Sequence, residues 1–123
     1  MGRLKEEFLL RVESFADRVL RVTDALDGRK VSRRILDQIA AAGTSVGANV
    51  FEADEAMSRP DFVKTLSIAA KELAETRFWL RLAARNQWLN PDLLHPIQRE
   101  ADELRRIIGT IIAKSKPPRP QSP

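Results

Sequence analysis

Three arginines recur at steps of four in the second half of the sequence, and their spacing predicts a phosphate-binding surface. Arg77, Arg81 and Arg85 fall on one side of a helix, because residues four apart are neighbours there. No acidic residue lies between Arg77 and Leu89. The planar guanidinium group binds phosphate through two hydrogen bonds, so such a row can hold a nucleic-acid backbone. The alternative is a solvated helix face that is balanced by glutamates of a neighbouring helix.

Other basic residues extend this candidate surface. Lys64 and Lys71 lie seven residues apart upstream of the arginines, and Arg105 and Arg106 lie downstream. Residues 58–89 hold 6 basic and 3 acidic residues, whereas residues 32–57 hold 2 and 4. The whole chain has a formal net charge of +4. We therefore expect the chain to bind RNA or DNA mainly through phosphates, with an affinity that falls as salt rises.

Four polar residues are candidates for a hydrogen-bonded network in or beside the core. They are Gln38, Asn49, Glu52 and Glu72. Asn49 precedes the expected core residue Val50 and lies three residues before Glu52, so both side chains share one side of a helix. Buried polar groups must be hydrogen-bonded, and such networks can fix how helices align. An exposed surface and an active-site role remain the alternatives.

The residue types that carry most catalysis are scarce in this chain. There is no Cys and one His, His95, which excludes disulfides, thiol catalysis and sites that need two imidazoles. Glu72 and Glu75 are suitably spaced carboxylates, but the Glu-x-x-His motif of di-iron bundles is absent. No Gly-rich loop precedes a helix as phosphate-binding loops do. We expect no enzymatic activity, no cofactor and no metal site.

The elements that must position these residues are four amphipathic helices. Apolar residues recur at steps of three and four over residues 4–26 and 32–57, then in a third segment from Ser58 and a fourth from Asn90. Ser32, Ser58 and Asn90 are the expected N-cap residues. No segment alternates as a strand would, and the short connections favour antiparallel neighbours. The sequence predicts an all-α, up-down-up-down four-helix bundle. The expected core is Leu4, Phe8, Val12, Phe15, Val19, Val22, Leu26, Ile35, Ile39, Ala42, Val46, Val50, Ala53, Phe62, Leu66, Ala69, Leu73, Thr76, Leu80, Ala83, Leu94, Ile97, Ala101, Leu104, Ile108 and Ile111.

The chain of 123 residues suits one domain, over residues 1–113. Residues 114–123 form a Pro-rich basic tail, which we expect to be disordered. No apolar run approaches the roughly 20 residues of a membrane span, and the N-terminus has no signal-peptide pattern. We therefore expect a cytoplasmic protein without a membrane partner.

Small residues dominate the second segment, where residues 40–48 read AAAGTSVGA. Gly43 and Gly47 lie four apart on one side, and each glycine costs about 1 kcal/mol relative to alanine inside a helix. Close approach of another helix would offset that cost. The two glycines are therefore candidates for a subunit interface, with packing inside the chain as the alternative. Trp79 borders the apolar stripe of its own helix and is a further interface candidate, with packing inside the bundle and base stacking as its alternatives.

Several short motifs together resemble a known family. They are SVGANVFE at residues 45–52, DF at 61–62, KELAET at 71–76 and FWL at 78–80. This order and spacing resemble the four-helix bundle proteins named for intervening sequences of 23S ribosomal RNA. Gln38 also stands where that family commonly has a glutamine upstream of the signature. The resemblance covers roughly residues 35–89.

The resemblance implies a bundle that assembles into a ring-shaped homo-oligomer, typically a homopentamer, with a basic surface. Five copies of +4 would give a ring about +20 in charge. It implies no established activity; nucleic-acid binding is the usual proposal. The chain is also similar to the accessory variability protein of diversity-generating retroelements, a pentamer that works with a reverse transcriptase. We expect a non-enzymatic nucleic-acid-binding oligomer, and the alternative is a protein-interaction scaffold for a partner such as a reverse transcriptase.

Overall fold

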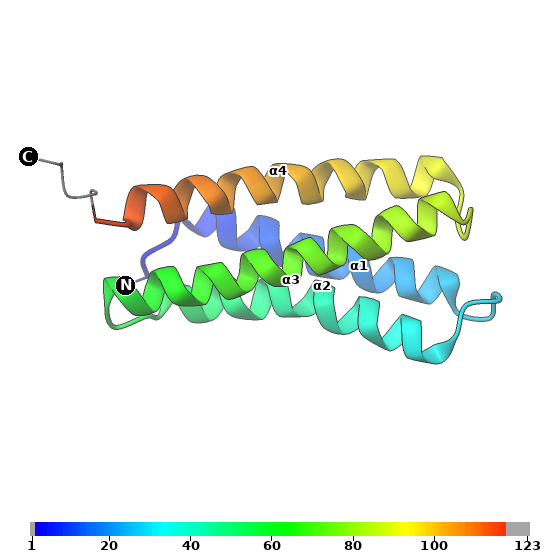
Figure 1. Ribbon diagram of the computed structural model, residues 1–123, viewed down its shortest axis with the longest axis horizontal. Coiled ribbons are helices and arrows are strands. Elements are labelled where there is room, and N and C mark those ends of the chain that lie inside the picture. The colour runs from blue at the N-terminus through cyan, green and yellow to red at the C-terminus, as the bar shows by residue number, and fades with distance from the viewer. Residues whose placement is uncertain (1, 118–123) are drawn as a thin grey trace, which may run out of the picture.

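The computed structural model describes residues 2–117, and these residues fold into four helices with no strand among them. The helices are α1 (Glu6–Leu26), α2 (Arg33–Asp54), α3 (Arg59–Arg85) and α4 (Pro91–Ser115). They lie side by side and alternate in direction, with α1 packed against α2 and α4, and α3 packed against α2 and α4 (Figure 1). The predicted all-α four-helix bundle is confirmed.

The three predicted N-caps are also confirmed. The Ser32 hydroxyl accepts a hydrogen bond from the Ile35 amide at 3.2 Å, and the Ser58 hydroxyl accepts one from the Asp61 amide at 3.2 Å. The side-chain oxygen of Asn90, Oδ1, accepts one from the Asp92 amide at 2.9 Å. Each bond satisfies an amide that the first helical turn leaves without a partner. α1 differs, because its N-cap residue is Lys5, which makes no side-chain cap.

The end of α4 corrects one boundary. The helix continues through Ser115, so Lys114 and Ser115 belong to the bundle and not to the predicted tail over residues 114–123. Residues 118–123, where most of the predicted tail falls, lie outside the described residues.

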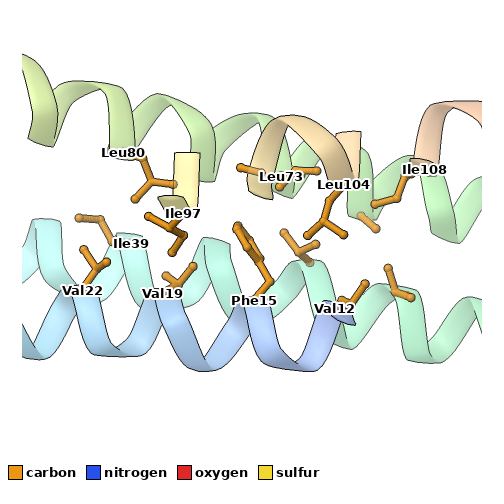
Figure 2. Close-up of a cluster of buried hydrophobic side chains, with 14 of the residues drawn as sticks. Val12, Phe15, Val19, Val22, Ile39, Leu73, Leu80, Ile97, Leu104 and Ile108 are labelled. Atoms are coloured by element: carbon orange, nitrogen blue, oxygen red, sulfur yellow. The ribbon is translucent and has the colours of Figure 1, made fainter. Parts of the chain in front are cut away.

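The core is one continuous cluster that draws side chains from all four helices. Figure 2 shows Phe15 of α1, Ile39 of α2, Leu73 of α3 and Leu104 of α4 meeting along the bundle axis, each fully buried. Of the predicted core residues, only three are partly exposed: Leu4, Ile35 and Ile111. Leu4 precedes α1 and Ile111 lies in the last turns of α4, where fewer neighbours can cover them.

The sequence prediction missed Leu89, which is buried in the connection between α3 and α4, and two buried leucines within the helices. Leu36 is buried beside the half-exposed Ile35, and Leu9 is buried beside Phe8. Each pair consists of adjacent apolar residues near the start of its helix. The repeating steps of three and four select one member of such a pair. The neighbouring helices bury Leu36 more fully than Ile35, whereas they bury both Phe8 and Leu9.

The two glycines of α2 pack inside the chain. A Cβ atom added at Gly43 would lie 2.8 Å from Cβ of Val19 on α1, and one added at Gly47 would lie 3.6 Å from Val12 Cγ1. Both glycines are buried. The prediction that they form a subunit interface is therefore wrong, because α1 already occupies that side of α2. The glycines allow the two helices to approach closely.

Three parts of the chain meet at one end of the bundle. The N-terminal segment and the last turn of α4 both lie at the end where α2 turns into α3 (Figure 1). Two bonds to Asp54, at the end of α2, hold the segment in place. The Arg3 amide donates to the Asp54 carbonyl at 3.2 Å, and the Leu4 amide donates to the Asp54 carboxylate at 2.7 Å.

Candidate nucleic-acid interface

Four exposed side chains form a strip along α3. Lys64, Lys71, Phe78 and Arg85 follow one another at intervals of seven, so two helical turns separate each from the next and all lie on one side of the helix. The Phe78 ring is 54% exposed. We call these four residues the outer strip. Phe78 was not among the site residues predicted from the sequence, although it lies seven residues from both Lys71 and Arg85.

The two adjacent aromatic residues of α3 have different environments. Trp79 is half-buried against the core, and its indole Nε1 donates a hydrogen bond to Glu75 Oε2 at 3.2 Å. Phe78 meets Trp79 edge-on, with ring centroids 5.2 Å apart and planes at 63°. Trp79 therefore supports the ring from one side, while the exposed part of Phe78 remains accessible. Of the two rings, Phe78 is the better placed to stack on an unpaired base.

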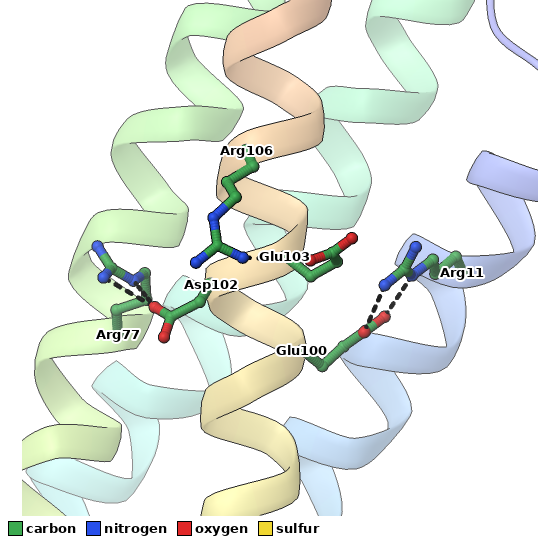
Figure 3. A network of polar contacts seen from close by, with 6 residues as sticks. All are labelled: Arg11, Arg77, Glu100, Asp102, Glu103 and Arg106. Carbon is green, nitrogen blue, oxygen red and sulfur yellow. Dashed lines mark hydrogen bonds and ion pairs between the residues drawn. The ribbon is translucent and has the colours of Figure 1, made fainter.

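The arginine row is divided between paired and unpaired members. Figure 3 shows Arg77 bonded to Asp102 of α4, with Nε and Nη2 at 2.9 and 2.8 Å from one carboxylate oxygen. Arg81 and Arg85 are exposed and make no ion pair in the part of the chain that the structure describes. From the sequence, glutamates of a neighbouring helix are the groups that could balance this row. The acid that does so is Asp102 of α4, and it pairs only with Arg77.

A groove between α3 and α4 runs beside this row. Its volume is about 200 Å³, and it is lined by Arg77, Leu80 and Arg81 of α3 and by Gln98, Ala101 and Asp102 of α4. The lining contains two cations, one carboxylate and one amide. Because Asp102 pairs with Arg77, Arg81 is the cation of the groove that makes no ion pair among the described residues.

The two predicted arginines of α4 also differ. Arg105 follows Gln98 and Asp102 at steps of four and three, so it continues their side of the helix next to α3. It is exposed and makes no ion pair within residues 2–117. Arg106 bonds Glu103 of its own helix at 3.3 Å. Arg105 is therefore the one that extends the basic surface, together with Arg81 and Arg85.

The predicted polar network does not form within this chain. Gln38 and Glu52 are exposed. The Asn49 amide donates to the Ser45 carbonyl of its own helix at 2.8 Å, and Thr76 donates to the backbone carbonyl of Glu72. Among the described residues, no hydrogen bond joins any two of the four side chains. The side chains of Asn49 and Thr76 instead donate hydrogen bonds to backbone carbonyls of their own helices.

An ion pair that the sequence analysis did not identify joins α1 to α4. Arg11 forms two parallel hydrogen bonds of 2.8 Å to the Glu100 carboxylate (Figure 3). These bonds hold the pKa of the Glu100 carboxyl below its usual value, against the opposing effect of partial burial, and raise the pKa of Arg11. The residues are 89 positions apart, so no local pattern could have paired them.

Two kinds of feature are absent from residues 2–117: a metal-binding cluster of side chains and a membrane-spanning helix. No three His, Cys, Asp or Glu residues there are placed to hold a metal ion. No helix there is long and apolar enough to cross a membrane.

The comparisons with known proteins agree with each other. The family model described as 23S rRNA-intervening sequence protein matches residues 7–110. A crystal structure from Bacteroides thetaiotaomicron, of a protein with unknown function from the S23 ribosomal protein family, superposes with a TM-score of 0.81. The two sequences are 32% identical, and the match covers 85% of this chain and 97% of that chain. No curated protein matches the sequence.

Proposed function

The chain belongs to the 23S rRNA-intervening sequence protein family, and we propose that it is a non-enzymatic protein that binds single-stranded segments of RNA or DNA. The outer strip of α3 carries this proposal. An exposed ring at Phe78 lies between the exposed cations Lys71 and Arg85 along one side of a helix. Proteins that bind single strands combine these two features, because cations hold phosphates while aromatic rings stack on bases.

In the proposed complex, phosphates contact Arg81, Arg85 and Arg105, which make no ion pair within residues 2–117, and Lys64 and Lys71 extend this basic surface. Arg77 contributes less, because Asp102 already offsets its charge. An unpaired base stacks on the exposed part of Phe78. The affinity for single strands should fall as the salt concentration rises. The logarithm of the binding constant falls against the logarithm of the salt concentration with a slope of about 0.7 for each phosphate contact.

The proposal includes a ring-shaped homo-oligomer, typically a pentamer, as the family resemblance implies. Apolar side chains on the outside of α2 and α3 support assembly, since Phe51 is 41% and Ile68 is 40% exposed. Trp79, half-buried in the single chain, remains a candidate interface residue. A ring would repeat the outer strip around its axis and strengthen binding through multiple contacts. Size-exclusion chromatography with light scattering measures the mass of the protein in solution. The mass of a monomer would contradict this part of the proposal.

The binding test uses fluorescence anisotropy with labelled single-stranded RNA and DNA. We expect Arg81→Glu/Arg85→Glu to weaken binding at least about tenfold and to flatten the salt dependence. The matched control, Arg21→Glu/Arg29→Glu, makes the same change in net charge on and beside α1, which packs against α2 and α4 and not against α3. It should lose far less affinity. Equal losses in the two variants would mean that binding follows net charge and not this surface.

Phe78→Ala tests base stacking separately from charge. It should lower the affinity by about fivefold or more while leaving the salt slope unchanged, because the ring contributes stacking and no charge. Lys71→Ala should reduce the dependence of affinity on salt and lower the affinity only modestly, because it removes a charge and no stacking surface. An unchanged affinity in Phe78→Ala would remove the ring from the binding surface.

A second candidate function is a protein-interaction scaffold, for a partner such as a reverse transcriptase. It is favoured by an apolar groove of about 260 Å³ between α1 and α4, lined by Val22, Ala25, Leu89, Leu93 and Ile97 with Arg18 and Arg21 at its rim. Leu93 is 61% exposed there. Protein purified without nuclease that carries no nucleic acid, and binds none of the probes, would make the scaffold the better proposal.

A further inference from the structure

A basic cavity lies at the end of the bundle where α2 turns into α3. Its volume is about 430 Å³. Three parts of the chain that are distant in sequence contribute its lining. The lining residues are Arg3 from the N-terminal segment, Arg59 and Phe62 from the start of α3, and Ile111, Lys114 and Ser115 from the end of α4.

The charges around this cavity are of one sign. Arg3, Arg59 and Lys114 line it, and no carboxylate does. None of these three cations makes an ion pair with another described residue. Five acidic residues lie within five positions of Arg3 or Arg59 in the sequence: Glu6, Glu7, Asp54, Glu55 and Asp61. Asp61 is two residues after Arg59, roughly 200° further around α3, and the Asp54 carboxylate accepts the hydrogen bond from the Leu4 amide. None of the five is part of the lining.

The position of Arg3 is fixed before any ligand binds. Its Nε donates to the Ala56 carbonyl at 2.8 Å, and its guanidinium carbon lies 5.7 Å from the centre of the Phe62 ring. The backbone bonds to Asp54 anchor the same segment. These contacts use one edge of the guanidinium group and leave both terminal nitrogens free to bind an anion. A fixed donor loses little entropy on binding, which favours affinity.

We infer that this cavity binds a phosphomonoester group, such as the phosphorylated end of a nucleic-acid strand. A phosphomonoester carries a charge of about −1.5 to −2 at pH 7, with three acceptor oxygens, whereas a phosphodiester within a strand carries about −1. Three cations that line one cavity therefore favour a terminal phosphate over an internal one. The strand as the source of the phosphate rests on the proposed function; a free nucleotide offers the same chemical group.

The cavity and the outer strip share α3. Arg59 is the first residue of α3, and Lys64, the first residue of the outer strip, follows five residues later, about 140° further around the helix. A strand with its phosphorylated end in the cavity would therefore curve around the first turns of α3 and then continue along the outer strip towards Phe78. The strip would supply affinity that is independent of the strand's end, and the cavity would supply a preference for a phosphorylated end.

The test compares three labelled oligonucleotides of one sequence, with a 5′-phosphate, a 3′-phosphate or no terminal phosphate. We expect the protein to bind one phosphorylated end about tenfold more tightly than the unphosphorylated strand. Arg59→Ala/Lys114→Ala should abolish this preference while keeping the affinity for the unphosphorylated strand. Arg3 is left unchanged because it also anchors the N-terminal segment. The control Arg29→Ala/Lys30→Ala, which removes one arginine and one lysine from the exposed connection between α1 and α2, should retain the preference.

A competition with adenosine monophosphate identifies the source of the phosphate. If the nucleotide displaces the 5′-phosphorylated strand from the protein but not from Arg59→Ala/Lys114→Ala, the cavity binds the monophosphate group as inferred. Equal affinity for all three strands, with no binding of the nucleotide, would overturn the inference and leave the proposed function intact. Nucleotide binding that requires Arg59 and Lys114, without binding of any strand, would support the cavity and overturn the proposed function.

Discussion

The contact between α1 and α2 and the outer strip of α3 are opposite kinds of surface. In the first, Gly43 and Gly47 bring two backbones together over buried valines, and no charge is present. In the second, the cations and the Phe78 ring remain exposed. The first surface is already occupied by another part of the chain, whereas the second has no internal partner. The comparison shows that a surface is available for binding only if the chain itself has not covered it.

The sharpest contrast is within one dipeptide of α3. Trp79→Ala should lower the free energy of unfolding by about 2 kcal/mol, because the half-buried indole packs on the core and donates to Glu75. Phe78→Ala should change it by less than about 0.5 kcal/mol, because more than half of that ring is in solvent. Chemical denaturation of both variants measures the difference. A large loss in Phe78→Ala would show that the outer strip is part of the packing.

Gly43→Ala tests the close approach of α1 and α2. The new Cβ would collide with Val19, so we expect a net loss of roughly 1 to 2 kcal/mol despite the better helix propensity of alanine. Thermal or chemical unfolding measures this loss. The double variant Gly43→Ala/Val19→Ala should lose less stability than the sum of the two single losses. The reason is that the new alanine methyl group fills the space that the valine leaves. Additive losses in the double variant would contradict the proposed contact.

Glu100→Gln tests the ion pair on the other side of α1, between α1 and α4. We expect a loss of about 1 kcal/mol at pH 7, since the Glu100 side chain is only 17% exposed and its loss of charge leaves Arg11 unpaired. The pKa of Glu100 is lowered in the folded chain from its ordinary 4.5. Its contribution is therefore complete above about pH 4.5 and is lost as pH falls through the lower, folded value. Chemical denaturation at a series of pH values from 7 to 3 should show the free energies of unfolding of the parent chain and of Glu100→Gln becoming equal.

Gly47→Ala is the matched control for Gly43→Ala and has the smallest expected effect. Its Cβ would lie at an ordinary contact distance of 3.6 Å from Val12. The gain in helix propensity, up to about 1 kcal/mol, should therefore leave the variant as stable as the parent chain or slightly more stable. The same unfolding measurement applies. A loss as large as that of Gly43→Ala would mean that the helices are close along the whole small-residue stretch.

Local patterns predicted the fold well. The steps of three and four located all four helices, and the hydroxyl and amide side chains of Ser32, Ser58 and Asn90 located three helix starts. These features depend on residues within one or two turns of each other, so the sequence contains them directly. Most of the predicted core is buried for the same reason.

The candidate site was predicted only in part. The sequence identified the arginine row, but it could not show that Asp102 neutralises Arg77 and leaves Arg81 and Arg85 unpaired. It also grouped four polar residues as a network, whereas Asn49 bonds to its own helix backbone. Both outcomes depend on which side of each helix its neighbours cover, and one helix cannot specify that side alone.

The sequence by itself determined where the helices begin, which stripe of each is apolar, and that the positive charge lies mainly on the second half of the chain. Only the tertiary structure decided that the glycines of α2 contact α1, and that Arg3, Arg59 and Lys114 line one cavity. The physical reason is the sequence separation over which each interaction acts. Helix propensity, capping and amphipathicity act between residues a few positions apart, whereas a shared cavity or a close helix contact requires the whole bundle to bring distant residues together.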